Sequence, residues 1–461
     1  MTSSSSLRRA GVVVGLVAAV AAGAGAGTRA SYGARTTGDE PHYLLTAISL
    51  AEDGDLDVSD EIAARRFEDF SEVGLNRQSR PLEGGRLVSP HDPVLPALLV
   101  PGVAVGGWLG AKLTLALLAG VLAAATLWLC VRRFGVPLLP ATVATGLFGA
   151  SAPLAVYGTQ VYPELPAALA TVGAVAAGTA ARGRGRLALA CASITALPWL
   201  SVKYAPVAVA LAAAIAWTWW REGDRAGTAW TFGILAASGV AFVAAHWAWY
   251  GGWTPYGVGD HFVTGEFGVV GFDPNFAGRS RRLVGLLVDR EFGLAAWQPA
   301  WLLALPALGA LAARRPRGWT FLALPLATGW LNATFVALTM HGWWWPGRQV
   351  VVVAPLVVVA VAAWAAASRR RLAALVGLGT AGVVTYAYLT VEALTGGLTV
   401  VVDFFETTNP LYRAWSAALP DYRHVTGATW VLHALWAAVA GAALWWGWRR
   451  ATRPSLGSAS P

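Results

Sequence analysis

The chain contains few charged residues, very little lysine and almost no cysteine. Only 13% of its 461 residues are Asp, Glu, Lys or Arg, whereas 56% are hydrophobic. The lysines are Lys112 and Lys203, and the two cysteines, Cys130 and Cys191, lie within apolar stretches. Soluble domains carry about twice this share of charge, and two cysteines so placed do not indicate a disulfide framework. The composition therefore excludes an ordinary soluble enzyme and a disulfide-stapled secreted domain.

Apolar residues gather in blocks that are long enough to cross a bilayer. A hydrocarbon core of ~30 Å needs about 20 residues of helix, whereas a β-barrel would show alternating strands of about ten residues. The sequence therefore predicts an all-α, polytopic integral membrane protein with about twelve transmembrane helices. The expected spans are 10–30, 109–131, 137–157, 163–181, 187–202, 204–220, 228–250, 293–313, 318–339, 349–367, 372–394 and 426–447.

Arginine is distributed unevenly between the segments that join these spans. If the N-terminus is cytoplasmic, that side holds 18 of the 34 basic residues and only two of the 25 acidic residues. Basic residues are retained on the cytoplasmic side of membranes. We therefore expect a multi-pass plasma-membrane protein with both termini in the cytoplasm. The net charge of +9 then reflects contact with membrane lipids, and no nucleic-acid partner is expected.

The expected spans define a single domain. Residues 1–447 would form one transmembrane domain, and residues 448–461 a short cytoplasmic tail. Residues 1–30 have basic, apolar and small-residue regions in the order of a signal peptide, so cleavage there is an alternative. The long loops at 31–108, 251–292 and 395–425 fall on the outer side in either case. We therefore expect any chemistry at the outer membrane surface.

The stretch TTGDEPHYLLTAISL (36–50) follows the first span. Pro41 suits the first position of a helix because it has no N–H to leave unpaired. Apolar residues then recur at helical spacing, so a short helix is predicted to lie in the membrane interface. Its positive N-terminal end would favour the ionised forms of Asp39 and Glu40. Plain capping of the helix is the alternative interpretation.

More acidic residues follow in EDGDLDVSD (52–60). Asp53, Asp55 and Asp57 alternate as the ligands of some calcium loops do, but the remaining ligands of an EF-hand are missing. We interpret this stretch as a solvated turn.

Three further charged residues stand at the expected outer ends of spans. Glu164 follows Tyr162-Pro163, and an ionisable group at a span mouth is costly and often functional. Lys203 in LPWLSVKYAP and Arg348 in WWWPGRQV are candidates to bind a phosphate, because cations beside aromatic residues suit such a ligand. As alternatives, Glu164 is a carboxylate that only reaches the membrane interface, and Lys203 and Arg348 are anchors within an aromatic belt.

Four stretches occur in an order that resembles the GT-C superfamily of membrane glycosyltransferases, such as protein mannosyltransferases and lipid A aminoarabinose transferases. The acidic pair Asp39-Glu40 lies in the first outer loop, as in that superfamily. It is followed by SPHDPVLPALLVPG (89–102), YGTQVYPELPAAL (157–169) and WWWPGRQVVVVAP (343–355). In the last stretch Gln349 and Val352 replace the usual aromatic residue and first proline. The likeness covers residues 1–370 and is nearest to actinobacterial members with GDEPHYL, PWL and DREFG segments.

The resemblance implies a GT-C-like fold and a hexosyl- or pentosyltransferase. A sugar would pass, with inversion, from a polyprenyl-phosphate donor to a hydroxyl of a lipid, glycan or protein acceptor at the extracytoplasmic face. Asp39 would be the base, supported by Glu40, and Glu164 a second catalytic acid. Lys203 and Arg348 would bind the donor phosphate.

Polar residues of the outer loops indicate further contacts around this site. Asp39 and His42 would hold a divalent cation if one is needed, and no other cofactor is expected. Residues expected to contact the acceptor or the surrounding loop are His91, Asp92, Tyr256 and Asp260.

Two other functions fit parts of the pattern. Twelve spans with both termini inside is a common layout of secondary transporters. Against this, no repeated half is found and the outer loops are long and acidic. No Gly-x-x-x-x-Gly-Lys stretch is present, which argues against an ATP-driven pump. An inactive GT-C-like scaffold is the third alternative.

Overall fold

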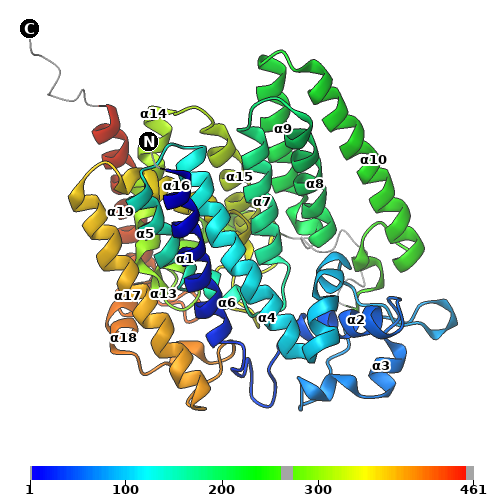
Figure 1. The fold of residues 1–461 in the computed structure, drawn as a ribbon. Coiled ribbons are helices and arrows are strands. Elements are labelled where there is room, and N and C mark those ends of the chain that lie inside the picture. Colours follow the sequence, from blue (N-terminus) through cyan, green and yellow to red (C-terminus); the bar gives the residue numbers. More distant parts are fainter. Residues whose placement is uncertain (1–2, 261–273, 453–461) are drawn as a thin grey trace, which may run out of the picture.

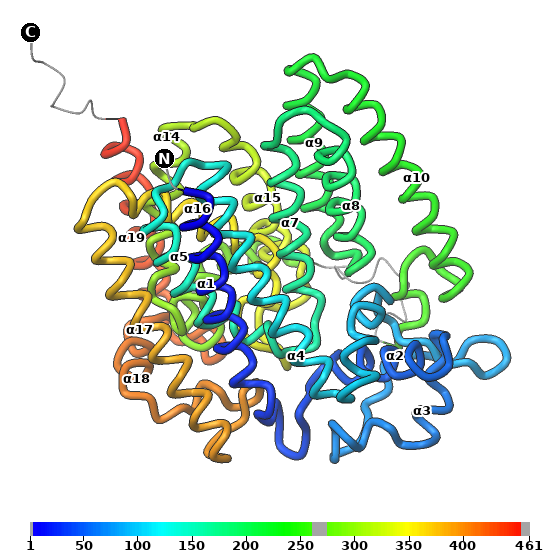
Figure 2. Tube along the Cα trace, in the orientation of Figure 1, coloured from blue at the N-terminus to red at the C-terminus, as the bar shows by residue number. Residues whose placement is uncertain are grey.

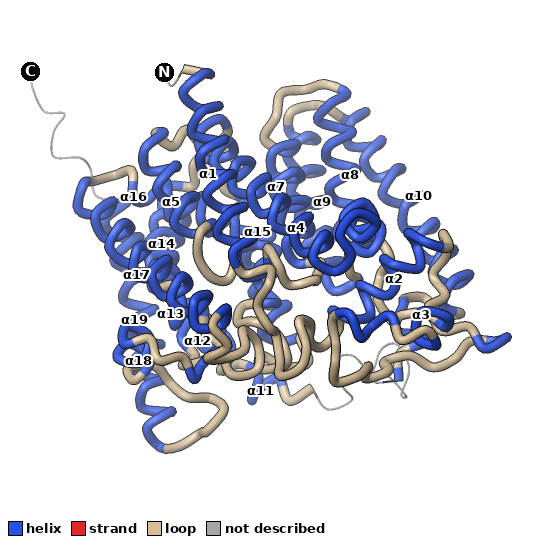
Figure 3. Tube along the Cα trace, turned by 60° about the horizontal axis from the view of Figure 1, so that its bottom comes forward, coloured by secondary structure: helices blue, strands red, loops and turns tan. Residues whose placement is uncertain are grey.

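The computed structural model describes residues 3–260 and 274–452, and within these ranges its regular elements are all helices (Figure 1). Only isolated β-bridges occur besides them. The longer helices pack side by side in a bundle, and most loops gather at one end with the short helices (Figure 3). The predicted all-α class is confirmed.

Seven helical segments in the described ranges are long and apolar enough to cross a membrane. They are Ser4–Ala24 (α1), Val94–Arg132 (α4), Val202–Arg221 (η3 and α9), Arg225–Val258 (α10 and η4), Arg348–Ala365 (η9 and α16), Arg369–Leu394 (α17) and Gly427–Thr452 (α19). The chain is therefore a multi-pass membrane protein.

The other expected spans form shorter helices, so the count of twelve crossings stays a prediction. These helices are Leu138–Gly149 (α5), Glu164–Gly178 (α7), Arg184–Leu200 (α8), Ala304–Arg314 (α14) and Thr320–Leu331 (α15). The predicted span 137–157 is divided into α5 and α6 (Leu154–Tyr157), since Pro153 between them has no N–H to continue a helix.

Both ends of the described chain lie at the same end of the bundle. α1 begins and α19 ends there, while α2 (Glu40–Glu52) and α3 (Ser59–Ala63) lie at the opposite end (Figures 1 and 2). We call the end with α2 and α3 the loop end. This arrangement agrees with an even number of crossings. Which end faces the cytoplasm stays a prediction.

Small residues let the helices approach closely, as is common in membranes. A Cβ atom at Gly120 of α4 would lie 2.6 Å from the carbonyl oxygen of Gly15 in α1. A Cβ at Gly309 of α14 would lie 2.0 Å from the carbonyl oxygen of Leu444 in α19. The abundant glycine of this chain thus serves helix contacts as well as turns.

A break within α4 shapes the loop end. Gly106 and Gly107 leave the helical conformation, and Gly107 has a φ of 55°, which favours glycine. The residues before the break, which begin at Val94, form a separate helical piece in contact with the first outer loop. The segment that carries His91 and Asp92 thereby lies beside α2.

α2 is present as predicted but is more enclosed than its amphipathic pattern indicates. The N-cap residue is Asp39, whose side chain makes no capping hydrogen bond, and the helix begins at Glu40. All residues from Glu40 to Ser49 are buried, because α4 and the rest of the loop cover the helix.

Short elements complete the loop end. They are η1 (Arg66–Asp69), η2 (Glu83–Gly85), α11 (Phe276–Arg279), α12 (Arg282–Val288), α13 (Leu294–Trp297), η7 (Pro299–Leu303), η8 (Asn332–Val336), η10 (Phe404–Glu406) and α18 (Pro410–Ser416).

Candidate functional site

Four residues singled out from the sequence meet in one network of ion pairs. Arg348 donates from Nη2 to Asp39 Oδ2 over 2.7 Å and from Nε to Glu164 Oε1 over 2.9 Å. The Nζ of Lys203 lies 2.5 Å from the same Glu164 oxygen. These residues come from positions 39, 164, 203 and 348, so the fold brings distant segments together. We call this group the Arg348 network.

Each member of the Arg348 network stands where a helix begins. Asp39 is the N-cap of α2, and Glu164 is the first residue of α7 after Pro163. Lys203 lies in η3, directly before α9, and Arg348 begins η9, directly before α16. Carboxylates are stabilised near helix N-termini, which helps to hold the two acids in their charged forms.

Aromatic rings fix the guanidinium of Arg348. Its Cζ lies 3.9 Å from the ring centroid of Tyr162 and 4.9 Å from that of Trp344. Arginine stacked on aromatic rings keeps its donors in a fixed plane. Of the neighbouring tryptophans, Trp345 is buried and Trp343 is exposed. The aromatic run thus positions a cation as well as covering the mouth of a span.

The charge of Asp39 is set by these neighbours. Its side chain is three-quarters buried, and burial alone would raise its pKa. Burial is the largest single influence, but Arg348, His91 and Lys203 together outweigh it and hold the pKa of Asp39 well below its ordinary value. Asp39 is therefore a carboxylate at neutral pH.

The network borders a polar cavity of about 220 Å³. Asp39, Lys203 and Arg348 all line it, whereas Glu164 is fully buried behind them. Glu164 thus holds the two cations in place without facing the cavity. The other polar residues of the lining are Tyr43, Gln78, His91, Ser201, Tyr256, Asn332 and Gln349.

Gln78 is a member of the site that the sequence did not reveal. Its Nε2 lies 3.4 Å from Asp39 Oδ1, and its Oε1 lies 3.0 Å from His91 Nε2. His91 stacks on Tyr43 at 4.6 Å, and burial lowers the pKa of His91 to about 3, so its ring is neutral. Gln78 lies in an irregular segment of the loop, and no motif or periodicity marks it.

The acidic pair of the first outer loop is split between two environments. Glu40 accepts hydrogen bonds from the backbone N–H groups of Val161 at 2.9 Å and Thr37 at 3.3 Å, and it does not line the polar cavity. Consecutive residues of a helix point about 100° apart, which separates Glu40 from Asp39. Glu40 joins two segments of the chain, a role different from the expected support of the base.

Asp92 also holds the site from behind. Its Oδ1 lies 3.0 Å from His246 Nε2, and its Oδ2 accepts from the N–H of Val202 at 3.3 Å. Both Asp92 and His246 are buried. Asp92 therefore fixes the turn that carries Lys203, whereas we expected it to contact the acceptor.

Of the two residues expected to contribute from the second long loop, one lines the cavity and the other does not. Tyr256 lines the polar cavity. Asp260 pairs its backbone N–H with the carbonyl oxygen of Gln78 at 2.9 Å, and its side chain is not part of the lining.

The two members of the expected metal pair have other contacts in the structure, so a metal ion between them stays a prediction. His42 Nε2 lies 2.9 Å from the carbonyl oxygen of Asn76, while Asp39 is engaged by Arg348 and Gln78. Within the described residues, the groups spaced to hold a metal ion lie elsewhere. They are Glu291, Asp421 and His424, and Asp53, Asp60 and Glu61.

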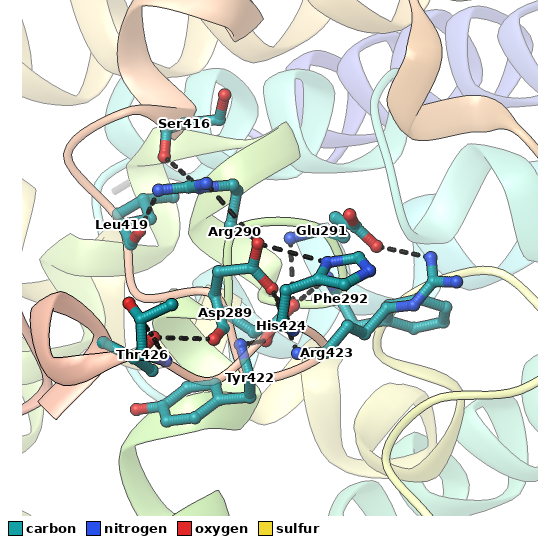
Figure 4. Close-up of polar contacts among 12 residues, drawn as sticks. Asp289, Arg290, Glu291, Phe292, Ser416, Leu419, Tyr422, Arg423, His424 and Thr426 are labelled. Atoms are coloured by element: carbon teal, nitrogen blue, oxygen red, sulfur yellow. Dashed lines mark hydrogen bonds and ion pairs between the residues drawn. The ribbon is translucent and has the colours of Figure 1, made fainter.

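The first of these groups belongs to a second cluster of charges, which we call the Arg423 cluster (Figure 4). Arg423 lies 2.6 Å from Glu291, and Arg290 lies 3.5 Å from Asp421. Arg290 also donates to the carbonyl oxygens of Ser416 and Leu419. Because arginines already neutralise both carboxylates, we interpret this cluster as a clasp between loops.

The fold that carries the Arg348 network is similar to that of ArnT from Cupriavidus metallidurans. The structure of ArnT from Cupriavidus metallidurans bound to undecaprenyl phosphate matches with a TM-score of 0.51 and 16% sequence identity, over 97% of this chain and 77% of that chain. The same protein in its apo state matches with a TM-score of 0.50 and 16% identity, over 95% and 75%.

No protein-family model and no curated protein matches the sequence. The order of motifs predicted a fold of this kind, and the likeness to ArnT agrees with that prediction. Membership of the GT-C superfamily and the likeness to actinobacterial members stay predictions.

Proposed function

We propose that the chain transfers a sugar from a polyprenyl-phosphate donor to an acceptor hydroxyl at the loop end, which we place at the extracytoplasmic face of the plasma membrane. The convergence of Asp39, Lys203 and Arg348 on one cavity carries this proposal. One carboxylate and two cations are the groups that such a reaction needs. The resemblance to a fold solved with undecaprenyl phosphate adds support.

An apolar cavity next to this site suits the lipid tail. It has a volume of about 700 Å³ and lies between α12, α14, α15, α16 and α19. Its lining includes Leu331 and Val350, whose chain neighbours Asn332 and Gln349 line the polar cavity. A lipid phosphate with its head at Lys203 and Arg348 would thus find apolar surface within reach for its chain.

In the proposed reaction, the acceptor oxygen attacks the anomeric carbon as the bond from that carbon to the phosphate oxygen breaks. The hydroxyl proton passes to Asp39, and polyprenyl phosphate leaves with the electron pair. Lys203 and Arg348 stabilise the negative charge on the departing phosphate. Phosphate leaves without being protonated, so one base is enough, and direct displacement inverts the anomeric centre.

The ion pair between Asp39 and Arg348 gives the donor a further role. In the described geometry Arg348 is shared between Asp39 and Glu164. A phosphate that binds Arg348 would compete with Asp39 for its donors. Weakening that ion pair raises the basicity of Asp39 when the donor is bound. Asp39 would then take up a proton only when the site holds the donor.

Incubation of the purified protein with radiolabelled polyprenyl-phosphate mannose, arabinose and glucose tests the proposal. We expect one donor to be consumed with transfer of label to a lipid, glycan or protein acceptor, and Asp39→Asn to lower the rate of transfer by about 10²- to 10⁴-fold. Solute uptake by proteoliposomes without any transfer would support the transporter. Lipid binding without transfer or uptake would support the inactive scaffold.

A further inference from the structure

Three carboxylates converge at the far end of α2 from Asp39. Asp53 follows the last residue of α2, while Asp60 and Glu61 lie in the first turn of α3. Each offers one carboxylate oxygen, and these three oxygens all lie within 4.8 Å of one another. Like charges this close repel strongly unless a cation or a proton lies among them.

Glu61 is the member that most needs a partner. It is only 3% exposed, and while Asp60 and Glu61 are both ionised neither carboxylate oxygen of Glu61 accepts a hydrogen bond. Burial of a carboxylate without a compensating partner is costly. The closest acidic neighbour, Asp60, can only add repulsion while both groups are ionised.

Nearby arginines do not neutralise this group. Arg66 forms two hydrogen bonds of 2.6 Å with Glu52, and Arg65 is paired with Glu68. Among the described residues, no ion pair connects a cation to Asp53, Asp60 or Glu61. No cationic side chain therefore pairs with the three carboxylates. Without a bound cation, burial and then a hydrogen bond with Asp60 raise the pKa of Glu61 to about 8.

The loop between the helices is built to present these groups together. Asp55 Oδ1 accepts hydrogen bonds from Ser49 Oγ and from the N–H of Asp57. Asp57 Oδ1 accepts from the N–H groups of Ser59 and Leu87. The alternating acids therefore have different roles. Asp55 and Asp57 stabilise the turn through hydrogen bonds, whereas Asp53 lies beside Asp60 and Glu61.

We propose that Asp53, Asp60 and Glu61 form a binding site for a calcium ion, which joins the end of α2 to α3. Calcium takes oxygen ligands and tolerates irregular geometry, whereas magnesium demands a near-ideal octahedron. The absence of His and Cys from the trio disfavours zinc and copper. The negative end of the α2 dipole adds attraction for a cation.

This site does not depend on the proposed sugar transfer. α2 has 13 residues, so the cation would bind about 20 Å from Asp39. Its effect would be to stabilise the first outer loop, from which α2 presents Asp39. Loss of the cation should therefore be visible in stability and in direct binding, whatever reaction the protein performs.

Thermal unfolding of the full-length protein in detergent tests the site. The protein is first treated with EDTA to remove bound metal, and the EDTA is then removed before calcium is added. We expect calcium at about 1–5 mM to raise the unfolding midpoint by a few degrees, with half of the effect in the range of about 0.1–1 mM. Equilibrium dialysis with ⁴⁵Ca²⁺ should then show one ion per chain.

Glu61→Gln provides the decisive variant, with Glu83→Gln as a matched control on an exposed acid of the same loop. Glu61→Gln should bind no calcium, lose the calcium-dependent rise and, because repulsion is relieved, unfold no earlier than the parent without calcium. Glu83→Gln should behave as the parent. If Glu61→Gln does not fold, Asp53→Asn at the exposed edge of the trio should lose the bound ion instead.

Three outcomes would overturn the assignment. The parent protein could bind no calcium, or Glu61→Gln and Asp53→Asn could retain the bound ion. An equal rise with magnesium would contradict the choice of calcium. A failure of sugar transfer would leave these measurements unaffected, so the two proposals can fail separately.

Discussion

The Arg348 network and the Arg423 cluster use the same residue types at the same end of the bundle but differ in what they face. Arg348 is 8% exposed, touches two carboxylates and borders a cavity. Arg423 is 35% exposed, and its neighbour Arg290 binds backbone carbonyl oxygens of the 416–419 segment. Paired arginines and acids therefore do not mark a site by themselves. An open cavity beside apolar space distinguishes the first group from the second.

Removal of the base should give the largest difference between the two groups. Asp39→Asn is expected to lower the rate of transfer by about 10²- to 10⁴-fold, because the hydroxyl proton loses its acceptor. Asp421→Asn in the Arg423 cluster should change the rate by less than about threefold. Single-turnover transfer with labelled donor measures both. Similar losses in the two variants would remove the distinction between network and clasp.

Removal of the central arginine should separate the groups by stability. Arg348→Ala leaves Asp39 and Glu164 short of a partner, and breaking a buried ion pair costs about 3–5 kcal/mol. Arg423→Ala breaks a more exposed pair, so a cost below about 1 kcal/mol is expected. Denaturant unfolding in mixed micelles compares the two free energies. Equal losses of unfolding free energy in the two variants would show that the ion pairs of Arg348 are no more buried than those of Arg423.

Gln78 should have a smaller effect, since it positions Asp39 without taking up the proton. Gln78→Leu removes its contacts with Asp39 and His91, and we expect kcat to fall about tenfold with little change in the KM of the donor. Arg77→Ala, at the exposed neighbouring position, is the control. A change in the donor KM alone would assign Gln78 to binding.

The smallest effect is expected from pH. Because the pKa of Asp39 is held well below its ordinary value, this carboxylate stays ionised as pH falls from 8 to about 5. Its favourable contribution to stability is fully present above the ordinary pKa of Asp and is lost progressively as pH falls from that value through the lowered pKa. The pH profile of kcat/KM should therefore have no acid limb in this range. An acid limb near pH 6 would contradict the assignment of Asp39 as a base paired with Arg348.

Much of the site could be predicted from the sequence because rare residues stand at informative places. Glu164, Lys203 and Arg348 are charges at the ends of apolar segments, where an unneeded charge is costly. The order of motifs predicted a GT-C-like fold, and the fold likeness to ArnT agrees with that prediction. The apolar blocks predicted the helices, but their lengths could not fix the number of crossings, since prolines and glycines divide or shorten several segments.

The parts that sequence reasoning missed depend on contacts between loops. Gln78 reaches Asp39 only because its irregular segment pairs with residues near 258, and no periodicity predicts such pairing. Glu40 and Asp92 were expected at the site because of their neighbours in the chain, yet each faces away from the cavity toward backbone N–H groups. The stretch with Asp53, Asp55 and Asp57 was interpreted as a solvated turn, and its spacing did not indicate that Asp53 lies beside Asp60 and Glu61.

Native mass spectrometry of undecaprenyl phosphate binding tests most directly whether the Arg348 network binds a lipid phosphate. We expect one bound lipid per chain for the parent and for Arg423→Ala. The affinity of Lys203→Gln for the lipid should be at least tenfold lower. Equal binding by the parent and Lys203→Gln would contradict it.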